Sequence, residues 1–231
     1  MRNPVLRTGA IASNLLSLAG GMPLAGVEMD AQYAAGDLDF LYSIDEIAHH
    51  MIILGYIHYA RRPPSILDVG CGQGRLFELL KNFRFKSYLG IDVSRVAIGR
   101  TRSLARKKAR FEVANFEEWQ PSKRFNMIIF NESLYYAARP LEVLVRYSRW
   151  LTRGGSIIVS MWRCSQNMAI WQDIHREFKV ANAHTVENRR GQIWDIELLR
   201  PRNALQRLSG HWVTLPLMRR FLKVLVHKGS R

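Results

Sequence analysis

The sequence has few cysteines and no long apolar run. Its two cysteines, Cys71 and Cys164, are too few for a disulfide framework, and their spacing is not that of a zinc site. No stretch approaches the roughly 20 uninterrupted apolar residues that a membrane-spanning helix requires. A mildly apolar run over residues 11–18 follows Arg2 and Arg7, but polar residues interrupt this region, so it makes a poor signal peptide. These absences favour the reducing cytoplasm as the location.

Acidic residues are missing from the C-terminal end. After position 199 the chain has eight Lys or Arg and no Asp or Glu, and the whole chain carries a formal net charge of +15. A basic tail of this kind predicts an anionic partner, either nucleic acid or a phospholipid surface. The alternative is that the excess charge only keeps the protein soluble.

The length of 231 residues suits one domain with short extensions rather than two domains. Residues 1–32 lack a clear period and predict a flexible N-terminal arm. The folded domain is expected over residues 33–201. Residues 202–231 predict a basic tail with an amphipathic helix that starts near position 216. The apolar stripe of that helix is Leu217, Phe221 and Leu225.

Apolar periodicity predicts an α/β fold. Ser43, with Glu46 three residues later, is a capping box, and the spacing that follows predicts a helix to about Ala60. Short apolar runs then alternate with helical segments, which is typical of parallel strands joined by crossover helices. Strands are predicted over residues 66–69, 87–91, 110–113, 126–130, 156–161, 183–186 and 192–199. Helices are predicted over residues 75–82, 95–107, 140–151 and 168–180, the third of them closed by Gly154 and Gly155. The expected fold is a seven-stranded, mostly parallel sheet with a C-terminal antiparallel hairpin and helices on both faces.

The strongest motif joins the first predicted strand to the next helix: Asp68-Val69-Gly70-Cys71-Gly72-Gln73-Gly74. Glycines allow positive φ and a close approach of the backbone to a ligand. The spacing Gly-x-Gly-x-Gly differs from the Gly-x-Gly-x-x-Gly of dinucleotide sites. Asp92 ends the second strand, where a carboxylate can accept hydrogen bonds from ribose hydroxyls, and Asn115 and Phe116 follow the third. Because these strand ends converge on one crevice, the motifs predict a site for an adenosine compound.

This set of motifs resembles that of the class I S-adenosylmethionine-dependent methyltransferases over residues 33–201. The resemblance implies a Rossmann-like fold and S-adenosylmethionine as the cofactor. It implies that the three glycines shape the turn around the methionine part, that Asp68 orders this loop, and that Asp92 holds the ribose. Asn115 and Phe116 would flank the adenine. The full set of implied cofactor contacts is Tyr33, His49, Asp68, Gly70, Cys71, Gly72, Gly74, Asp92, Val93, Asn115, Phe116 and Asn131.

The catalytic candidates come from the N-terminal region and from the segment after the fourth strand. Relatives commonly bring a Tyr and a basic residue over the cofactor; Tyr33 and His49 match these, with His49 standing where relatives often carry Arg. Methyl transfer requires in-line alignment and, where needed, removal of a proton. Glu132 is the first candidate for the base or for a hydrogen-bond acceptor to substrate, and the alternative is a carboxylate that favours a helix N-terminus. Tyr135 and His50 complete the catalytic set. The sequence shows no metal-ligand cluster, which predicts a metal-independent enzyme.

The acceptor is less well defined than the cofactor. The string Glu132-Ser133-Leu134-Tyr135-Tyr136 is similar to one in nodulation-factor N-methyltransferases, and the Asn/Asp-Pro-Pro-Tyr/Phe arrangement of base-methylating enzymes is absent. The resemblance implies methyl transfer to an O or N atom of a small molecule such as a sugar or secondary metabolite. In the final hairpin, only one of Trp194 and Asp195 can face the site, since neighbours in a strand alternate, and the alternative for either is a structural role. His58 and His184 are further candidates.

Two other functions stay open at this point. One is an RNA- or protein-modifying methyltransferase that uses the basic tail to hold its polymer. The other is a non-catalytic cofactor-binding protein that docks on a membrane surface through the tail. The expected location is the cytoplasm, with peripheral attachment to an anionic membrane as an alternative.

Overall fold

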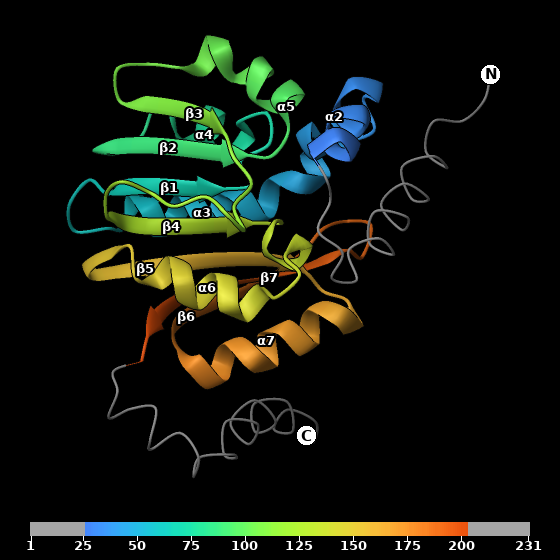
Figure 1. Cartoon of the computed structure of the whole chain (residues 1–231). Helices are drawn as coiled ribbons and strands as arrows, with labels where there is room; N and C mark the ends of the chain where they lie inside the picture. The colour runs from blue at the N-terminus through green and yellow to red at the C-terminus, as the bar shows by residue number, and fades with distance from the viewer. Residues whose placement is uncertain (1–25, 203–231) are drawn as a thin grey trace, which may run out of the picture. The chain divides into compact units, whose positions relative to one another are not determined.

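The computed structural model describes residues 26–202, and Figure 1 shows how its elements are arranged. The helices are α2 (Gly26–Ala35), α3 (Ile47–His58), α4 (Arg75–Leu80), α5 (Arg95–Arg100), α6 (Pro140–Ser148) and α7 (Ser165–Glu177). Four short 3₁₀ helices are η1 (Asp39–Tyr42), η2 (Ile44–Glu46), η3 (Thr101–Leu104) and η4 (Leu134–Tyr136). The strands are β1 (Ser65–Val69), β2 (Ser87–Asp92), β3 (Ala109–Val113), β4 (Phe125–Asn131), β5 (Leu151–Trp162), β6 (Phe178–Glu187) and β7 (Ile193–Pro201).

The strands of this part of the chain form one seven-stranded sheet in the order β3-β2-β1-β4-β5-β7-β6. The pairs from β3 through β5 are all parallel. β7 runs antiparallel to both β5 and β6. The predicted sheet, mostly parallel and ending in an antiparallel hairpin, is therefore confirmed. The chain order reverses between β1 and β4, and a crevice at the carboxyl ends of the strands is expected there.

Helices cover both faces of the sheet (Figure 1). Successive residues of β1 point to opposite faces, so Ile66 packs in the cluster that contains α3 and α4, and Leu67 in the cluster that contains α6 and α7. Every residue of β1 is buried, as expected for the central strand of a parallel sheet. Asp68 is thus a carboxyl group inside a buried apolar strand, which marks the end of β1 as a functional position.

The glycines at 154 and 155 belong to β5 and do not close a helix. α6 ends at Ser148, and the backbone N–H of Phe125 donates to Trp150 O at 2.8 Å, so pairing with β4 has already begun. The register of β4 against β5 shifts after this point, and Gly154 has a φ of +77°. The predicted helix end is wrong because the two glycines form an irregularity within the strand, a common role for glycine in sheets.

Two helices end earlier than predicted. β6 follows α7 directly, so Val180 lies in a strand and pairs with Leu199 of β7. Pairing with a neighbouring strand outweighs the weak helical pattern at these residues. After α5, η3 stops at Leu104 because Arg106 pairs with Ala109 and turns the chain into β3.

The first predicted helix does not start through a capping box. Ser43 makes no side-chain cap hydrogen bond, and the chain enters α3 through η2. Glu46, the predicted partner of Ser43, is buried at 5% exposure and lines a pocket instead. The carboxyl group expected at the helix start thus belongs to the candidate site.

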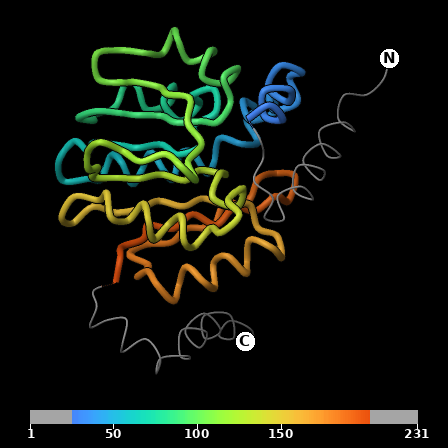
Figure 2. Tube along the Cα trace, in the orientation of Figure 1, coloured from blue at the N-terminus to red at the C-terminus, as the bar shows by residue number. Residues whose placement is uncertain are grey.

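Ordered structure begins before the predicted position 33. α2 starts at Gly26, so residues 26–32 of the predicted arm are helical, and Figure 2 shows this blue segment beside α5. Asp30 joins the two helices, since it accepts hydrogen bonds from Ser94 Oγ at 2.6 Å and from Val96 N at 3.1 Å. The rest of the arm and the predicted tail, with its helix near 216, lie outside the described residues. Within residues 26–202, no helix combines the length and apolar character needed to cross a bilayer.

Candidate functional site

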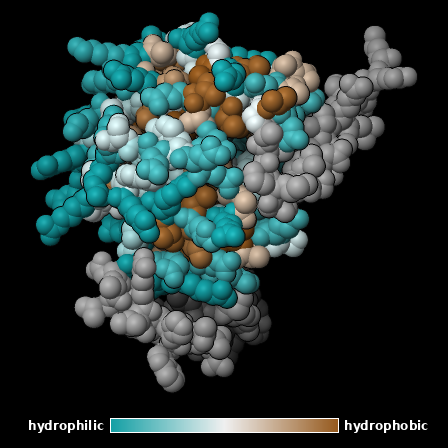
Figure 3. All heavy atoms as spheres, in the orientation of Figure 1, coloured by the Kyte–Doolittle hydropathy of each residue, from teal (hydrophilic) through white to brown (hydrophobic). Residues whose placement is uncertain are grey.

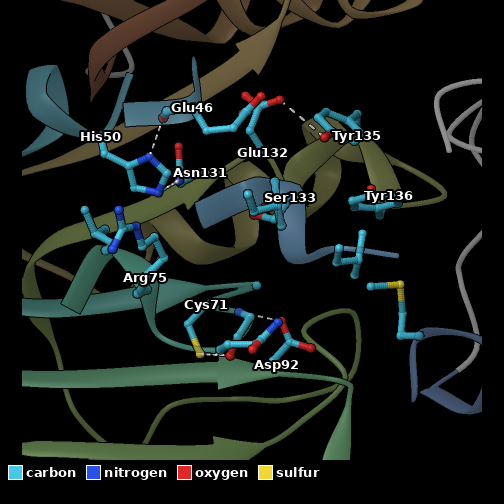
Figure 4. Close-up of a pocket in the computed structure, with 18 of the residues that line it drawn as sticks. Glu46, His50, Cys71, Arg75, Asp92, Asn131, Glu132, Ser133, Tyr135 and Tyr136 are labelled. Carbon is cyan, nitrogen blue, oxygen red and sulfur yellow. Dashed lines mark hydrogen bonds between the residues drawn. The ribbon is translucent and has the colours of Figure 1, made fainter. Parts of the chain in front are cut away.

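A pocket opens at the carboxyl ends of the parallel strands, where the chain order reverses. The loop after β1, the ends of β2 and β4, and the segment after β3 form its wall, and Figure 4 shows part of the lining. The lining residues from this wall include Asp68, Gly70, Cys71, Gly72, Gln73, Arg75, Asp92, Val93, Asn115, Phe116, Asn131 and Glu132. The structure therefore brings together the strand ends that the motif analysis grouped.

The glycine loop is fastened to β2 through its backbone. The N–H groups of Gly70 and Cys71 both donate to Ile91 O, at 2.8 and 2.9 Å. Gly72 has a φ of +52°, and a Cβ at this position would lie 2.7 Å from the Tyr33 hydroxyl. A side chain does not fit there, so glycine is required both by the backbone and by the space.

Gly74 differs from the other predicted cofactor contacts, because it does not line the pocket. It is the N-cap of α4 with a φ of +82°, and a Cβ there would meet the side chain of Leu104 at 2.8 Å. The structure gives Gly74 a packing role between α4 and η3. A contact of Gly74 with the cofactor stays a prediction.

Asp92 links the loop to the end of β2. Its Oδ2 accepts a hydrogen bond from Gly72 N at 2.8 Å, and its Oδ1 accepts one from Ser94 N at 2.9 Å. The side chain is buried, and this burial raises its pKa. Each carboxylate oxygen has a second lone pair, so Asp92 can still accept hydrogen bonds from a ligand in the pocket.

Asp68 has one satisfied oxygen and one unpaired oxygen. The Tyr88 hydroxyl donates to Oδ2, whereas Oδ1 is buried without a hydrogen-bond partner in the described part of the chain. Burial raises the pKa of Asp68 to about 7. A positively charged ligand group would satisfy Oδ1 and favour the ionised carboxylate. Sequence analysis missed Tyr88, since a tyrosine within a strand carries no sign of its partner.

Val93, Asn115 and Phe116 form the side of the pocket next to β3. Asn115 Oδ1 accepts a hydrogen bond from Glu117 N at 3.0 Å, which fixes the side chain to the turn that it starts. The ring of Phe116 meets that of Phe130 edge to face, with centroids 6.3 Å apart. This side offers a mostly apolar slot of the kind that a planar base occupies.

The cover of the pocket comes from α2 and η1. Among the residues of this cover, Tyr33 is the one that the sequence predicted as a cofactor contact, and its side chain is buried at 4% exposure. The apolar residues that line the pocket from this cover are Met29, Tyr33, Leu38, Phe40 and Leu41. Sequence analysis missed the other members, because it placed Met29 in the arm and saw no periodic element over residues 38–41.

Glu132 lies at the end of the pocket next to β5 (Figure 4). Its φ of +54° is uncommon for a residue other than glycine. Its carboxylate accepts hydrogen bonds from Trp162 N at 3.1 Å, Ser160 Oγ at 3.2 Å and Tyr135 OH at 3.3 Å. None of these three donors is a backbone N–H of η4. The contacts therefore do not support the alternative role at a helix N-terminus.

Two carboxyl groups and two imidazoles meet at this same end. The side chains of Glu46 and Glu132 point toward one another in Figure 4. His49 Nδ1 donates to Asn131 Oδ1 at 2.9 Å, and Asn131 Nδ2 donates to His50 Nε2 at 3.2 Å. His49 Nε2 lies 3.4 Å from Glu46 Oε2 but forms no hydrogen bond within the described residues. It is thus a buried acceptor that faces the pocket.

Burial sets the charge of this end of the pocket. It lowers the pKa of His49 to about 4 and that of His50 to about 3. It raises the pKa of Glu46 to about 7 and that of Glu132 to about 8, and the nearby Glu46 carboxylate adds to the second shift. At neutral pH the imidazoles are uncharged, and the two carboxyl groups lose their protons between about pH 7 and pH 8. Groups with such pKa values are typical of acid–base sites.

The hairpin supplies one side chain to the pocket. Trp194 lines it and stacks on His49, with ring centroids 5.2 Å apart and planes inclined by 13°. Its neighbour Asp195 faces away and pairs with Arg163. The further candidates that do not line the pocket are His58, His184 and Asp195.

Arg75 is the one Lys or Arg that lines the pocket within residues 26–202. It is the first residue of α4, its guanidinium lies 4.9 Å from the centre of the Tyr42 ring, and it pairs with Glu78 at 3.4 Å. Sequence analysis missed this cation, although its place directly after the last glycine of the loop was the available signal.

These residues fit the cofactor that the resemblance implied. The unpaired Asp68 Oδ1 suits an ammonium group, Arg75 suits a carboxylate, and Asp92 suits ribose hydroxyls. The space at Gly72, which a Cβ would fill, lets the ligand approach the backbone. No group of three or more His, Cys, Asp or Glu is placed to hold a metal ion in the described part of the chain.

Sequence comparisons agree with this geometry. A family model for a methyltransferase domain matches residues 48–211, which is more than half of the chain. Malonyl-[acyl-carrier protein] O-methyltransferase of a Paenibacillus species is 28% identical over 136 residues, 55% of this chain and 48% of the relative. Trans-aconitate 2-methyltransferase of an Acidovorax species is 31% identical over 103 residues, 43% of this chain and 38% of the relative. The matched region spans less than half the length of each of these two relatives.

A solved structure shares the fold. The N-methyltransferase NodS from Bradyrhizobium japonicum, crystallised with S-adenosyl-L-homocysteine, matches with a TM-score of 0.61 at 16% identity, covering 72% of this chain and 92% of that chain. The family model, the sheet order and the loop after β1 all point the same way. The chain therefore belongs to the methyltransferase domain family, which confirms the resemblance to class I S-adenosylmethionine-dependent methyltransferases.

Proposed function

We propose that the pocket binds S-adenosylmethionine and that the protein transfers its methyl group to an O or N atom of a small-molecule acceptor. The observation that carries this proposal is that one pocket contains both the Gly72–Asp92 hydrogen bond and the carboxyl group of Glu132. A site suited to adenosine and a proton-accepting group therefore lie in the same pocket. Asp92 would hold the ribose, and Val93, Asn115 and Phe116 the adenine.

Asp68 and Arg75 would hold the two ends of the methionine part. The unpaired Asp68 Oδ1 suits its amino group, and Arg75 suits its carboxylate. Arg75 thereby supplies the cation for the carboxylate that His49, standing where relatives often carry Arg, does not supply. His49 is neutral and buried against Trp194, which makes it a poor partner for an anion.

Glu132 would take the proton from the acceptor. When bound, the cofactor supplies a methyl group on a sulfonium centre that a nucleophilic O or N atom can attack. Glu132 is held by Trp162, Ser160 and Tyr135, so its carboxylate is positioned before an acceptor arrives. Its pKa of about 8 is close to the range in which a general base is most effective.

The acceptor end favours a neutral or cationic molecule. Its carboxyl groups are Glu46 and Glu132, and the histidines there are uncharged. An anionic acceptor would find no cation among the described residues at this end of the pocket, because Arg75 is engaged with the cofactor. We therefore expect an amine or a hydroxyl as the acceptor group. NodS, which shares the fold, is an N-methyltransferase, in line with this choice.

Two measurements test the proposal. Calorimetry with S-adenosylhomocysteine tests the cofactor site, and Asp92→Ala is expected to abolish measurable binding because it removes both hydrogen bonds that hold the loop and strand end. Screening pools of amines, alcohols and carboxylic acids for S-adenosylhomocysteine release tests the reaction. Binding without turnover on any pool would favour the non-catalytic alternative, and unchanged binding in Asp92→Ala would refute the assigned site.

A further inference from the structure

Exposed Lys and Arg gather at the end of the parallel strands that lies opposite the pocket. At the carboxyl edge, the pocket is lined by five acidic residues and one cation, Arg75. Those acidic residues are Glu46, Asp68, Asp92, Glu117 and Glu132.

The segments directly before β1 to β5 hold Lys and Arg without any Asp or Glu. Because these strands are parallel, the segments share the amino edge of the sheet. We call these residues the basic edge: Arg61, Arg62, Lys81, Arg84, Lys86, Arg106, Lys107, Lys108, Lys123, Arg124 and Arg149. All of them are exposed, and in Figure 3 long hydrophilic side chains project from the left of the molecule, the side on which the arrows of β1, β2 and β4 begin in Figure 1.

The basic edge is not neutralised within the domain. Within residues 26–202 no ion pair involves any of its members. Clustered Lys and Arg create a positive local potential that attracts anions from solution. The charge is thus available to a partner.

Part of the basic edge surrounds a hollow with an aromatic floor. Five of its cations line this hollow together with phenylalanine side chains. These lining residues are Lys81, Arg84, Arg106, Lys107, Lys108, Phe77, Phe83 and Phe85. Close by, the exposed ring of Tyr59 and the partly exposed ring of Phe83 both contact His58, with centroids 6.1 and 5.9 Å away. Cations and exposed aromatic rings therefore lie side by side.

The position of the edge argues against a substrate polymer. β1 alone has five residues, and a strand rises about 3.3 Å per residue, so the two edges of the sheet are about 17 Å apart. An RNA held along the basic edge would therefore have to bend around the sheet to bring a base into the pocket at the other end of the strands. A surface that only anchors the protein has no such conflict.

The chemistry of the basic edge matches the headgroup region of a bilayer. Anionic phospholipids attract clustered Lys and Arg, and the amphipathic ring of Tyr is favoured at the headgroup level. β7 ends on the same edge because it runs antiparallel to β5. The sequence then continues through residues 203–231, which contain six Lys or Arg and no Asp or Glu. We propose that the basic edge docks on an anionic phospholipid surface and leaves the pocket facing solution.

The test is the partition of the full-length protein onto vesicles. Vesicles of phosphatidylcholine with phosphatidylglycerol are compared with vesicles of phosphatidylcholine alone, at a fixed moderate salt concentration. The protein is expected to bind the first and not the second. The double variant Arg84→Gln with Lys107→Gln removes two cations of the hollow and is expected to bind the anionic vesicles about 30-fold more weakly.

A matched double variant controls for total charge. Arg95→Gln with Arg139→Gln removes two exposed cations that follow strand ends at the carboxyl edge, and its vesicle binding is expected to stay within about a factor of three of the wild type, since it takes no charge from the docking face. S-adenosylhomocysteine affinity should be unchanged in both variants. Equal losses in the two variants, or no loss in the first, would overturn the proposal. A single-stranded RNA that binds more tightly than the vesicles, with its binding lost only in the first variant, would replace phospholipid by nucleic acid as the partner.

Discussion

The hydroxyl of Tyr33 lies 2.7 Å from the point at which a Cβ on Gly72 would stand. Tyr33 thus places α2 close to the loop after β1, although the two segments are far apart in the sequence. Asp92 holds the same glycine from the other side through its backbone N–H. The packing of α2 on the loop and the hydrogen bond from the loop to β2 therefore both involve Gly72, which has no side chain.

Replacement of Gly72 by Ala is expected to weaken S-adenosylhomocysteine binding at least tenfold. The new methyl group displaces Tyr33, and the left-handed φ of +52° costs about 1–2 kcal/mol for a residue with a Cβ. Calorimetry measures the affinity. Gly55→Ala is the control, since a Cβ at this helical position meets no atom within 4 Å. That variant should keep its affinity and gain about 0.5–1 kcal/mol of stability.

The double variant Gly72→Ala with Tyr33→Phe distinguishes the steric conflict with the Tyr33 hydroxyl from the strain of a left-handed backbone at position 72. Loss of the hydroxyl makes room for the Cβ, so part of the lost affinity should return. If the double variant binds no better than Gly72→Ala, the contact with Tyr33 is not the cause of the defect.

Replacement of Arg75 by Met is expected to lower S-adenosylhomocysteine affinity by about tenfold or more, because a charged hydrogen bond to the ligand carboxylate is lost. Arg75 also pairs with Glu78 at 3.4 Å, and a structural effect through this pair has to be distinguished. Glu78→Gln removes the pair and keeps the cation, so its affinity should stay at or above that of the wild type. A comparable loss in Glu78→Gln would assign the effect to the helix start.

Replacement of Glu132 by Gln is expected to lower kcat by about 10²-fold or more on an amine or hydroxyl acceptor. Binding of S-adenosylhomocysteine should be unchanged. In the wild type the rate should rise with pH until the Glu132 pKa of about 8 is passed, since the base acts in its ionised form. The variant should lose this rise. A variant that raises KM and keeps the kcat profile would show that Glu132 only binds the acceptor.

Stability should fall between pH 6.5 and pH 8. Folding raises the pKa of Glu46 from 4.5 to about 7 and that of Glu132 from 4.5 to about 8. The folded state therefore holds protons that the unfolded chain has released, and its stability falls as pH rises through this range. The pKa values of His49 and His50, lowered from 6.5, act in the opposite direction but only below pH 6.5.

Thermal unfolding at several pH values measures this fall. It should be smaller in Glu46→Gln and in Glu132→Gln, because each variant removes one of the groups that ionise. Glu118→Gln, an exposed change outside the pocket, is the control and should follow the wild type. An unchanged slope in both pocket variants would contradict the pKa shifts on which the acid–base role depends.

The sheet and the cofactor side of the pocket could be predicted because they depend on local patterns. The apolar composition of β1 predicts a buried strand, the glycines predict the loop that follows it, and Asp92 is identified by its place at the end of a strand. The errors arose where tertiary pairing decides the outcome. The local pattern at Gly154 predicts a helix end, but β5 already pairs with β4 at Leu151, before Gly154 is reached.

The acceptor side was predictable only in part. Glu132 and the two histidines were found, yet Glu46 was assigned to a capping box because its spacing from Ser43 fits one. Whether a carboxyl group caps a helix or turns into a pocket depends on what packs above it. Arg75 illustrates the same limit, since residues from separate elements meet only after folding.

The basic edge places exposed positive charge without ion-pair partners among the described residues at one end of the strands, so charge is unevenly distributed along the domain. Near an anionic surface such a molecule experiences a torque before it makes any contact, so it would approach with one orientation favoured over the others. A ligand that enters the pocket does so at the other end of the strands, away from this charge. Ionic strength should therefore affect surface association more strongly than ligand capture.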